Sequence, residues 1–132
     1  MTERETLFTY RLQEAEETLA DAVQMLEASC SPRSIVNRAY YAMFYAVLAL
    51  FIRFETIHKT SKHSGIIGIF NKEFVHTGMV EIKYAKMLSA IFEARLEGDY
   101  KGLVELTDDH AQDAVHKARV FLTAIKELIA TP

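Results

Sequence analysis

The stretch from Ala39 to Ile52 constrains the fold most, because it has no charged residue and is apolar on two sides of a helix. One helical face carries Tyr40, Phe44, Val47 and Phe51, and another carries Tyr41, Tyr45, Leu48 and Ile52. A helix with two apolar faces must be covered on both of them. We therefore expect this helix at the centre of a bundle, partly covered by a second copy of the chain in a homodimer.

Apolar residues recur at three- and four-residue spacing along the rest of the chain, which is the period of an amphipathic helix. The predicted helices cover about residues 4–28, 32–54, 61–78 and 80–98, and a last one begins at residue 107. With only 5 Gly and 2 Pro, the chain can form few turns. The predicted fold class is all-α, an antiparallel up-and-down bundle of about five helices, four long and one short. We expect residues 1–132 to form a single domain.

The predicted helices have recognisable ends. Polar residues that can cap helix N-termini are Ser31, Ser61 and Thr107. Pro32 follows the first of these caps and fits the first helical position. Glycine commonly ends a helix, so Gly78 is expected to end the third helix and Gly98 the fourth.

The charge and the cysteine count limit the classes of partner and compartment. The net charge is −3 and the isoelectric point is about 5.9. An acidic protein repels phosphate overall, so any contact with nucleic acid requires a local basic patch. The single cysteine, Cys30, cannot form an internal disulfide, and the N-terminus lacks the pattern of a signal peptide. The 14 residues from Ala39 to Ile52 are fewer than the about 20 that span a bilayer. We expect a cytoplasmic protein with no membrane association and no cofactor.

An arginine interrupts the apolar stripe of the fourth predicted helix. The stripe runs through Tyr84, Leu88 and Ile91. The next position on this line is Arg95, and Asp99 and Tyr100 follow it closely. A buried guanidinium needs a partner or a cleft. Arg95 and Asp99 can form a structural ion pair, or Arg95 can bind phosphate at the mouth of a groove.

A second concentration of charge lies between the second and third predicted helices. It consists of Arg53, His58, Lys59, Lys62 and His63, opposed only by Glu55. The cluster leads into a helix N-terminus, where free backbone amides favour anions. It can be a solvated turn or an edge that touches a nucleotide or nucleic-acid phosphate.

Metal chemistry and nucleophilic catalysis are less well supported. Three pairs have the acid-x-x-His spacing of di-iron bundles: Glu55 with His58, Glu73 with His76, and Asp113 with His116. A di-iron site needs such pairs in mid-helix, but His58 falls in a connection and His76 beside a helix end. We therefore predict no metal site. Cys30 has no histidine nearby in the sequence, and there is no glycine-rich phosphate loop.

Four stretches together resemble the HEPN domain family. They are 37–46 (NRAYYAMFYA), 61–65 (SKHSG), 70–78 (FNKEFVHTG) and 95–100 (RLEGDY). They occur in the family's order, and the resemblance extends from about Arg4 to Ile129. It is closest to small free-standing prokaryotic HEPN proteins. The resemblance implies a five-helix bundle that dimerises and forms a cleft across the dimer, and it adds Asn37 and Arg38 to the expected binding residues.

The resemblance leaves the activity open. Many HEPN proteins are metal-independent endoribonucleases, others are non-catalytic, and many are encoded beside a small nucleotidyltransferase as a toxin–antitoxin pair. The family's nuclease motif is an arginine and a histidine with four to six residues between them. Arg95 matches the arginine, but that window holds no histidine, and Asp99 comes one residue too early. Histidine moves protons near neutral pH, whereas an ionised aspartate is a weaker base and a poor acid.

Three functions remain as hypotheses. In the first, a dimeric HEPN module binds nucleotide or RNA phosphate through Arg95, Lys62 and His63. It works in a toxin–antitoxin-like pair with a nucleotidyltransferase, for which Tyr100 is by position a conceivable modification site. In the second, a metal-independent endoribonuclease uses Arg95 to stabilise charge and Asp99 or His63 to carry the proton. In the third, the chain is a non-catalytic dimerisation scaffold. The expected ligand-binding residues are Arg95, Tyr100, Lys62, His63, Asn37 and Arg38, and the expected catalytic residues are Arg95, Asp99 and His63.

Overall fold

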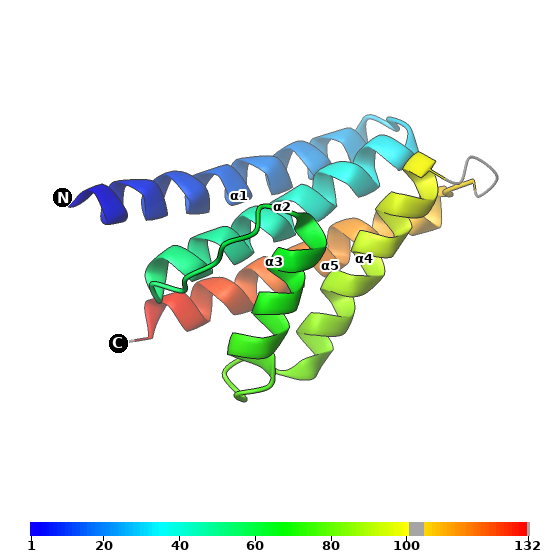
Figure 1. Ribbon diagram of the computed structural model, residues 1–132. Coiled ribbons are helices and arrows are strands. Elements are labelled where there is room, and N and C mark those ends of the chain that lie inside the picture. Colours follow the sequence, from blue (N-terminus) through cyan, green and yellow to red (C-terminus); the bar gives the residue numbers. More distant parts are fainter. Residues whose placement is uncertain (101–104, 132) are drawn as a thin grey trace.

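The computed structural model is a bundle of helices (Figure 1). It describes residues 1–100 and 105–131, and for residues 97–100 it describes the backbone alone. The helices are α1 (Glu3–Glu27), α2 (Pro32–Arg53), α3 (His63–Phe70), the π-helical turn η1 (Asn71–Val75), α4 (Ile82–Tyr100) and α5 (Asp108–Ala130). No strand occurs in the described ranges. The predicted all-α bundle of about five helices is confirmed.

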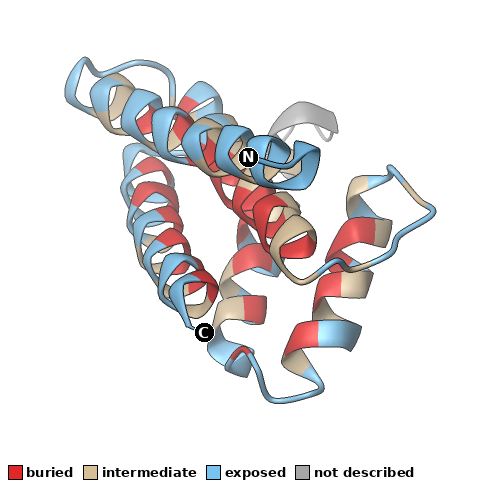
Figure 2. Cartoon of the chain, turned by 90° about the vertical axis from the view of Figure 1, so that its left-hand side faces the viewer, coloured by how far each residue is buried: buried red, intermediate tan, exposed pale blue. Residues whose placement is uncertain are grey.

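Helix α2 lies at the centre, packed against α1, α4 and α5 (Figure 1). The inner sides of the helices carry the buried residues (Figure 2). The first predicted face of α2 is buried, from Tyr40 at 0% exposure to Phe44 at 6%. The second face is half-buried at each of its positions, which are Tyr41, Tyr45, Leu48 and Ile52. The chain's own helices therefore cover one face of α2 fully and the other only in part.

The apolar character of α2 is explained by its position in the core. Among the described residues, α2 is the one helix long and apolar enough to cross a membrane by length and composition. Yet 67% of its most apolar window is buried inside the bundle. The central helix of a folded bundle meets the same criteria of length and hydropathy.

Two of the predicted helix ends are confirmed. Ser31 accepts a hydrogen bond from the Ser34 backbone N–H at 3.3 Å, and Pro32 is the first residue of α2. Thr107 accepts one from the His110 backbone N–H at 3.3 Å, while the His110 ring accepts the Thr107 N–H at 2.9 Å. This reciprocal arrangement is a capping box in which histidine takes the place usually held by glutamate or glutamine.

Two other predicted ends are wrong. Ser61 does not cap α3, because the cap position is Lys62 and its backbone N–H donates to the Thr60 hydroxyl at 3.1 Å. Thr60 also fits closely against Gly65, where an added Cβ would lie 2.5 Å from the threonine methyl carbon. Gly98 does not end α4, since the helix continues through Tyr100.

The central position of α2 gives a prediction for stability. Leu50 is 0% exposed, so Leu50→Ala should lower the free energy of unfolding by about 2–5 kcal/mol, because it leaves a cavity in the core. Ile82 at the start of α4 is 64% exposed, and the comparable Ile82→Ala change should cost no more than about 0.5 kcal/mol. Urea unfolding followed by circular dichroism measures both values. Equal losses in the two variants would contradict the central position of α2.

Candidate functional site

Arg95 reaches from α4 across to α2. Its Nε donates to Asn37 Oδ1 at 3.1 Å, and its Nη2 donates to the Tyr41 hydroxyl at 3.3 Å. Its guanidinium carbon lies 5.2 Å from the ring centre of Tyr40 and 5.3 Å from that of Tyr41, which is the range of cation–π contact. Arg95 has further contacts besides these and is half-buried. The guanidinium at the end of the apolar stripe is thus held by an amide and two phenols.

His63, the first residue of α3, meets the same part of α2. Its Nδ1 lies 2.9 Å from the Tyr40 hydroxyl, and its ring stacks on Phe44 with centroids 4.1 Å apart. Burial lowers the pKa of His63 below the ordinary value of 6.5, and the charge of Arg95 lowers this pKa further. His63 and Arg95 therefore contact the same tyrosine from two different helices.

We call these six residues the Arg95 cluster: Asn37, Tyr40, Tyr41, Phe44, His63 and Arg95. The four residues from α2 recur at three- and four-residue spacing, so one side of that helix presents an amide, two phenols and a phenyl ring. Burial raises the pKa of the Tyr40 phenol well above its ordinary value of 10.0, although the charge of Arg95 opposes this. The cluster accordingly holds its positive charge at Arg95 beside the neutral phenol of Tyr40, and this arrangement is suited to binding an anion.

The structure brings together three of the residues selected from the sequence. Arg95, His63 and Asn37 all belong to the cluster. Lys62 adjoins His63 and is exposed, and Arg38 is exposed on α2 next to Asn37. The backbone of Asp99 and Tyr100 lies in the last turn of α4, but their side chains are outside the described residues.

Sequence reasoning missed the part played by Tyr40, Tyr41 and Phe44, which it assigned to packing alone. The spacing of Asn37 to Tyr40, Tyr41 and Phe44 was the available signal, because it places a polar side chain on the same helical side as two phenols.

The rest of the basic cluster before α3 lies elsewhere. Arg53 donates to the backbone oxygen of Thr131 at 3.3 Å, which ties the end of α2 to the end of α5. His58 hydrogen-bonds the backbone oxygen of Thr60 and packs near Phe51. The predicted basic edge is therefore divided, and only its last two residues, Lys62 and His63, lie at or beside the Arg95 cluster.

The acid-x-x-His pairs do not converge. Glu55 pairs with Arg4 at 3.1 Å, and Asp113 pairs with Lys117 at 2.7 Å. Within residues 1–96 and 105–131, no three His, Cys, Asp or Glu side chains come close enough to hold a metal ion.

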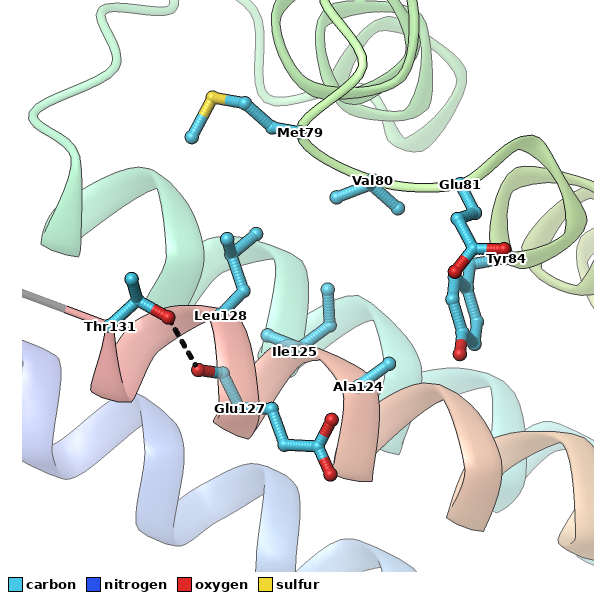
Figure 3. A pocket seen from close by; sticks show the side chains of 9 residues that line it. All are labelled: Met79, Val80, Glu81, Tyr84, Ala124, Ile125, Glu127, Leu128 and Thr131. Carbon is cyan, nitrogen blue, oxygen red and sulfur yellow. Dashed lines mark hydrogen bonds between the residues drawn. The ribbon is translucent and has the colours of Figure 1, made fainter.

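A pocket of about 230 Å³ lies between the start of α4 and the end of α5 (Figure 3). Val80, Tyr84 and Ile125 are among its lining residues, and its rim includes Glu81 and Glu127. None of its lining residues belongs to the Arg95 cluster. The pocket and the cluster are therefore separate features of the molecule.

Comparison with known proteins identifies the family. The model of the HEPN domain matches residues 8–128, a range that includes every residue of the Arg95 cluster. The chain belongs to the HEPN domain family. This HEPN domain is 42% identical over 129 residues to a UPF0332 protein of Thermotoga maritima, covering 98% of this chain and 96% of that protein.

Two relatives of this HEPN domain in Methanocaldococcus jannaschii have informative names. One, named "Putative toxin MJ0605", is 31% identical over 87% of this chain and 83% of its own length. The other, named "Putative toxin MJ0142", is 33% identical over 71% of this chain and 63% of its own length.

The acid sensitivity of this HEPN domain should depend on His63. Because the folded state holds the pKa of His63 below 6.5, the unfolded chain takes up the proton first as the pH falls. The contribution of His63 to stability is therefore complete above about pH 6.5 and is lost as the pH falls toward the folded-state pKa. Between about pH 7.5 and 5.5, urea unfolding should show that the free energy of unfolding falls more steeply in the wild type than in His63→Gln, because glutamine does not titrate. Equal slopes would contradict the depressed pKa.

Proposed function

We propose that this HEPN domain binds RNA or nucleotide phosphate at Arg95 and acts in a toxin–antitoxin-like pair. The observation that carries the proposal is the way Arg95 is held. Asn37 and Tyr41 accept its hydrogen bonds, and two phenol rings lie against its charge. A guanidinium fixed in this way has a defined orientation. This favours bidentate hydrogen bonds, in which two N–H groups donate to two phosphate oxygens.

The local charges support a site for an anion on an otherwise acidic protein. Lys62 is exposed and precedes His63 at the start of α3, and Arg38 is exposed and follows Asn37 on α2. The net charge of the chain is −3, and these local charges offset the overall repulsion of phosphate. Two relatives carry the word toxin in their names, which supports the toxin–antitoxin part of the proposal.

The partner in this proposal is a nucleotidyltransferase. Tyr100 ends α4, five residues after Arg95, and it is the residue that such a partner would modify. The pair would act in the cytoplasm, where RNA is available.

A second candidate function is a metal-independent endoribonuclease. The contact between His63 and Tyr40 favours it, because it brings a histidine to the arginine of the cluster although the motif window after Arg95 contains no histidine. In this mechanism Arg95 stabilises the developing charge, and His63 or Asp99 moves the proton of the 2′-hydroxyl.

We further propose that the chain works as a homodimer through the second face of α2. Tyr41, Tyr45, Leu48 and Ile52 are half-buried along the length of that helix, and exposed Leu7 and Tyr10 lie on the neighbouring α1. Such a patch is typical of a contact with another protein chain. A homodimer would complete the cover that a helix with two apolar faces requires.

Replacing Arg95 tests the phosphate site. Arg95→Ala should weaken the binding of a structured RNA by about tenfold or more, since hydrogen bonds to a charged group contribute about 1.5–3 kcal/mol. Filter binding at low salt with a chelator present measures affinity, and gel analysis of the same samples detects cleavage. Cleavage that disappears in Arg95→Ala would support the endoribonuclease, and binding of intact RNA would support the binding module.

The matched control is Arg119→Ala, which removes the same charge from an exposed position on α5. Its RNA affinity should stay within about threefold of the wild type, because surface charges outside a site have small effects. Since Arg95→Ala also removes two hydrogen bonds, its urea unfolding is measured alongside. Equally poor binding by the wild type and Arg95→Ala would favour the dimerisation scaffold.

Light scattering at micromolar concentration should give the wild type twice the mass of one chain. Tyr45→Lys places a charge in the second face of α2 and should shift the mass toward that of one chain, because an unpaired buried charge is costly. The control is Tyr84→Lys, the same change at a half-buried position that faces α5. A wild type that is monomeric at these concentrations would contradict the proposed homodimer.

A further inference from the structure

We propose that Tyr40 is a positioning residue that holds His63 with its proton on Nε2, so that His63 donates a hydrogen bond to an RNA phosphate oxygen rather than acting as a base. This inference rests on the proposed function, because the phosphate is the one that Arg95 binds. It assigns a role to the proton of the Tyr40 hydroxyl, to which neither the binding hypothesis nor the nuclease hypothesis gives one.

The first argument is the isolation of the Tyr40 hydroxyl. Tyr40 is 0% exposed, and a buried hydroxyl proton needs an acceptor. Among the described residues, the one hydrogen-bond partner of this hydroxyl is His63 Nδ1, at 2.9 Å. Arg95 lies against the ring of Tyr40 but only donates hydrogen bonds. The proton of the Tyr40 hydroxyl must therefore point to His63 Nδ1.

The second argument is the number of protons on each ring. A neutral imidazole has one N–H and one lone pair, on different nitrogens. Burial keeps the phenol of Tyr40 protonated by raising its pKa, and it keeps His63 neutral by lowering the pKa of its ring. When Nδ1 accepts the phenol proton, the remaining proton of His63 is on Nε2. The opposite tautomer would leave the buried Tyr40 proton without an acceptor.

The third argument is the orientation of the ring. The His63 ring stacks on Phe44 with an angle of 27° between the planes, which restricts rotation about the side chain. Its Nδ1 edge faces the fully buried Tyr40, whereas His63 as a whole is half-exposed. Because the N–H bond at Nε2 points in a different direction from the lone pair at Nδ1, the Nε2–H is not directed at Tyr40 and can be offered to a ligand.

The consequence is a site with two donors and no base at His63. His63 and Arg95 lie against the same two phenol rings, since the His63 ring centre is 5.6 Å from those of both Tyr40 and Tyr41. Two donors that lie against the same pair of phenol rings suit the oxygens of one phosphate group. An Nε2–H cannot take up the proton of a 2′-hydroxyl, so His63 supports binding and not the first step of cleavage.

The tautomer can be measured directly in the full chain. Nitrogen-15 NMR of the free wild type at neutral pH should show the His63 proton on Nε2, with the exposed His116 as an internal reference. In Tyr40→Phe, which keeps the ring but removes the hydroxyl, the His63 signals should shift toward a mixture of tautomers. A proton on Nδ1 in the wild type, or unchanged signals in Tyr40→Phe, would overturn the role of Tyr40.

Two amide replacements test the donor. The side-chain NH₂ of glutamine falls near the position of histidine Nε2, and that of asparagine falls near Nδ1. His63→Gln should therefore bind a single-stranded oligouridine within about threefold of the wild type, while His63→Asn and His63→Ala lose about tenfold. Equal losses in His63→Gln and His63→Ala, or better binding by His63→Asn, would overturn the donor role.

The two experiments separate this inference from the proposed function. If the wild type binds neither the structured RNA nor oligouridine at low salt but its His63 proton is on Nε2, the proposed function and the RNA donor role fail together. Tyr40 then keeps its positioning role. If RNA binds at Arg95 and the proton is on Nδ1, the proposed function stands and this inference fails.

Discussion

The hydrogen bond between Tyr40 and His63 is the interaction on which the site depends. Tyr40 is completely buried in α2, and its hydroxyl meets a histidine from α3 at 2.9 Å while Arg95 from α4 lies against its ring. Three helices thus meet at one phenol. Because the hydroxyl has no access to water, the position of the α3 N-terminus is coupled to the protonation of His63.

The helices could be predicted from the sequence because their signals are local. The apolar spacing runs along each helix, and the caps at Ser31 and Thr107 lie next to the helix ends that they mark. Gly98 misled the prediction, since a glycine inside a helix costs only about 1 kcal/mol and the rest of α4 can offset that cost. At Ser61 the error has a local cause, because the hydroxyl that accepts the Lys62 backbone N–H at the start of α3 belongs to Thr60.

The site could be predicted only in part, because its contacts join residues far apart in the sequence. Arg95 was recognisable as a charge on an apolar stripe, and His63 as one member of a basic segment. Their meeting at Tyr40 depends on how α3 crosses α2, which no local pattern encodes. A tyrosine with a core-like environment and a tyrosine that positions a histidine look the same in sequence, since both require burial.

The double role of α2 also sets a limit on how the site can change. The same three- and four-residue spacing that builds the core places Asn37, Tyr40 and Tyr41 beside Arg95. A change at Tyr40 must therefore keep the volume of the core as well as the hydroxyl. Phenylalanine meets the first requirement and not the second, because it retains the ring and lacks the donor. Packing and proton placement are consequently separable at this one position, although a single side chain supplies both.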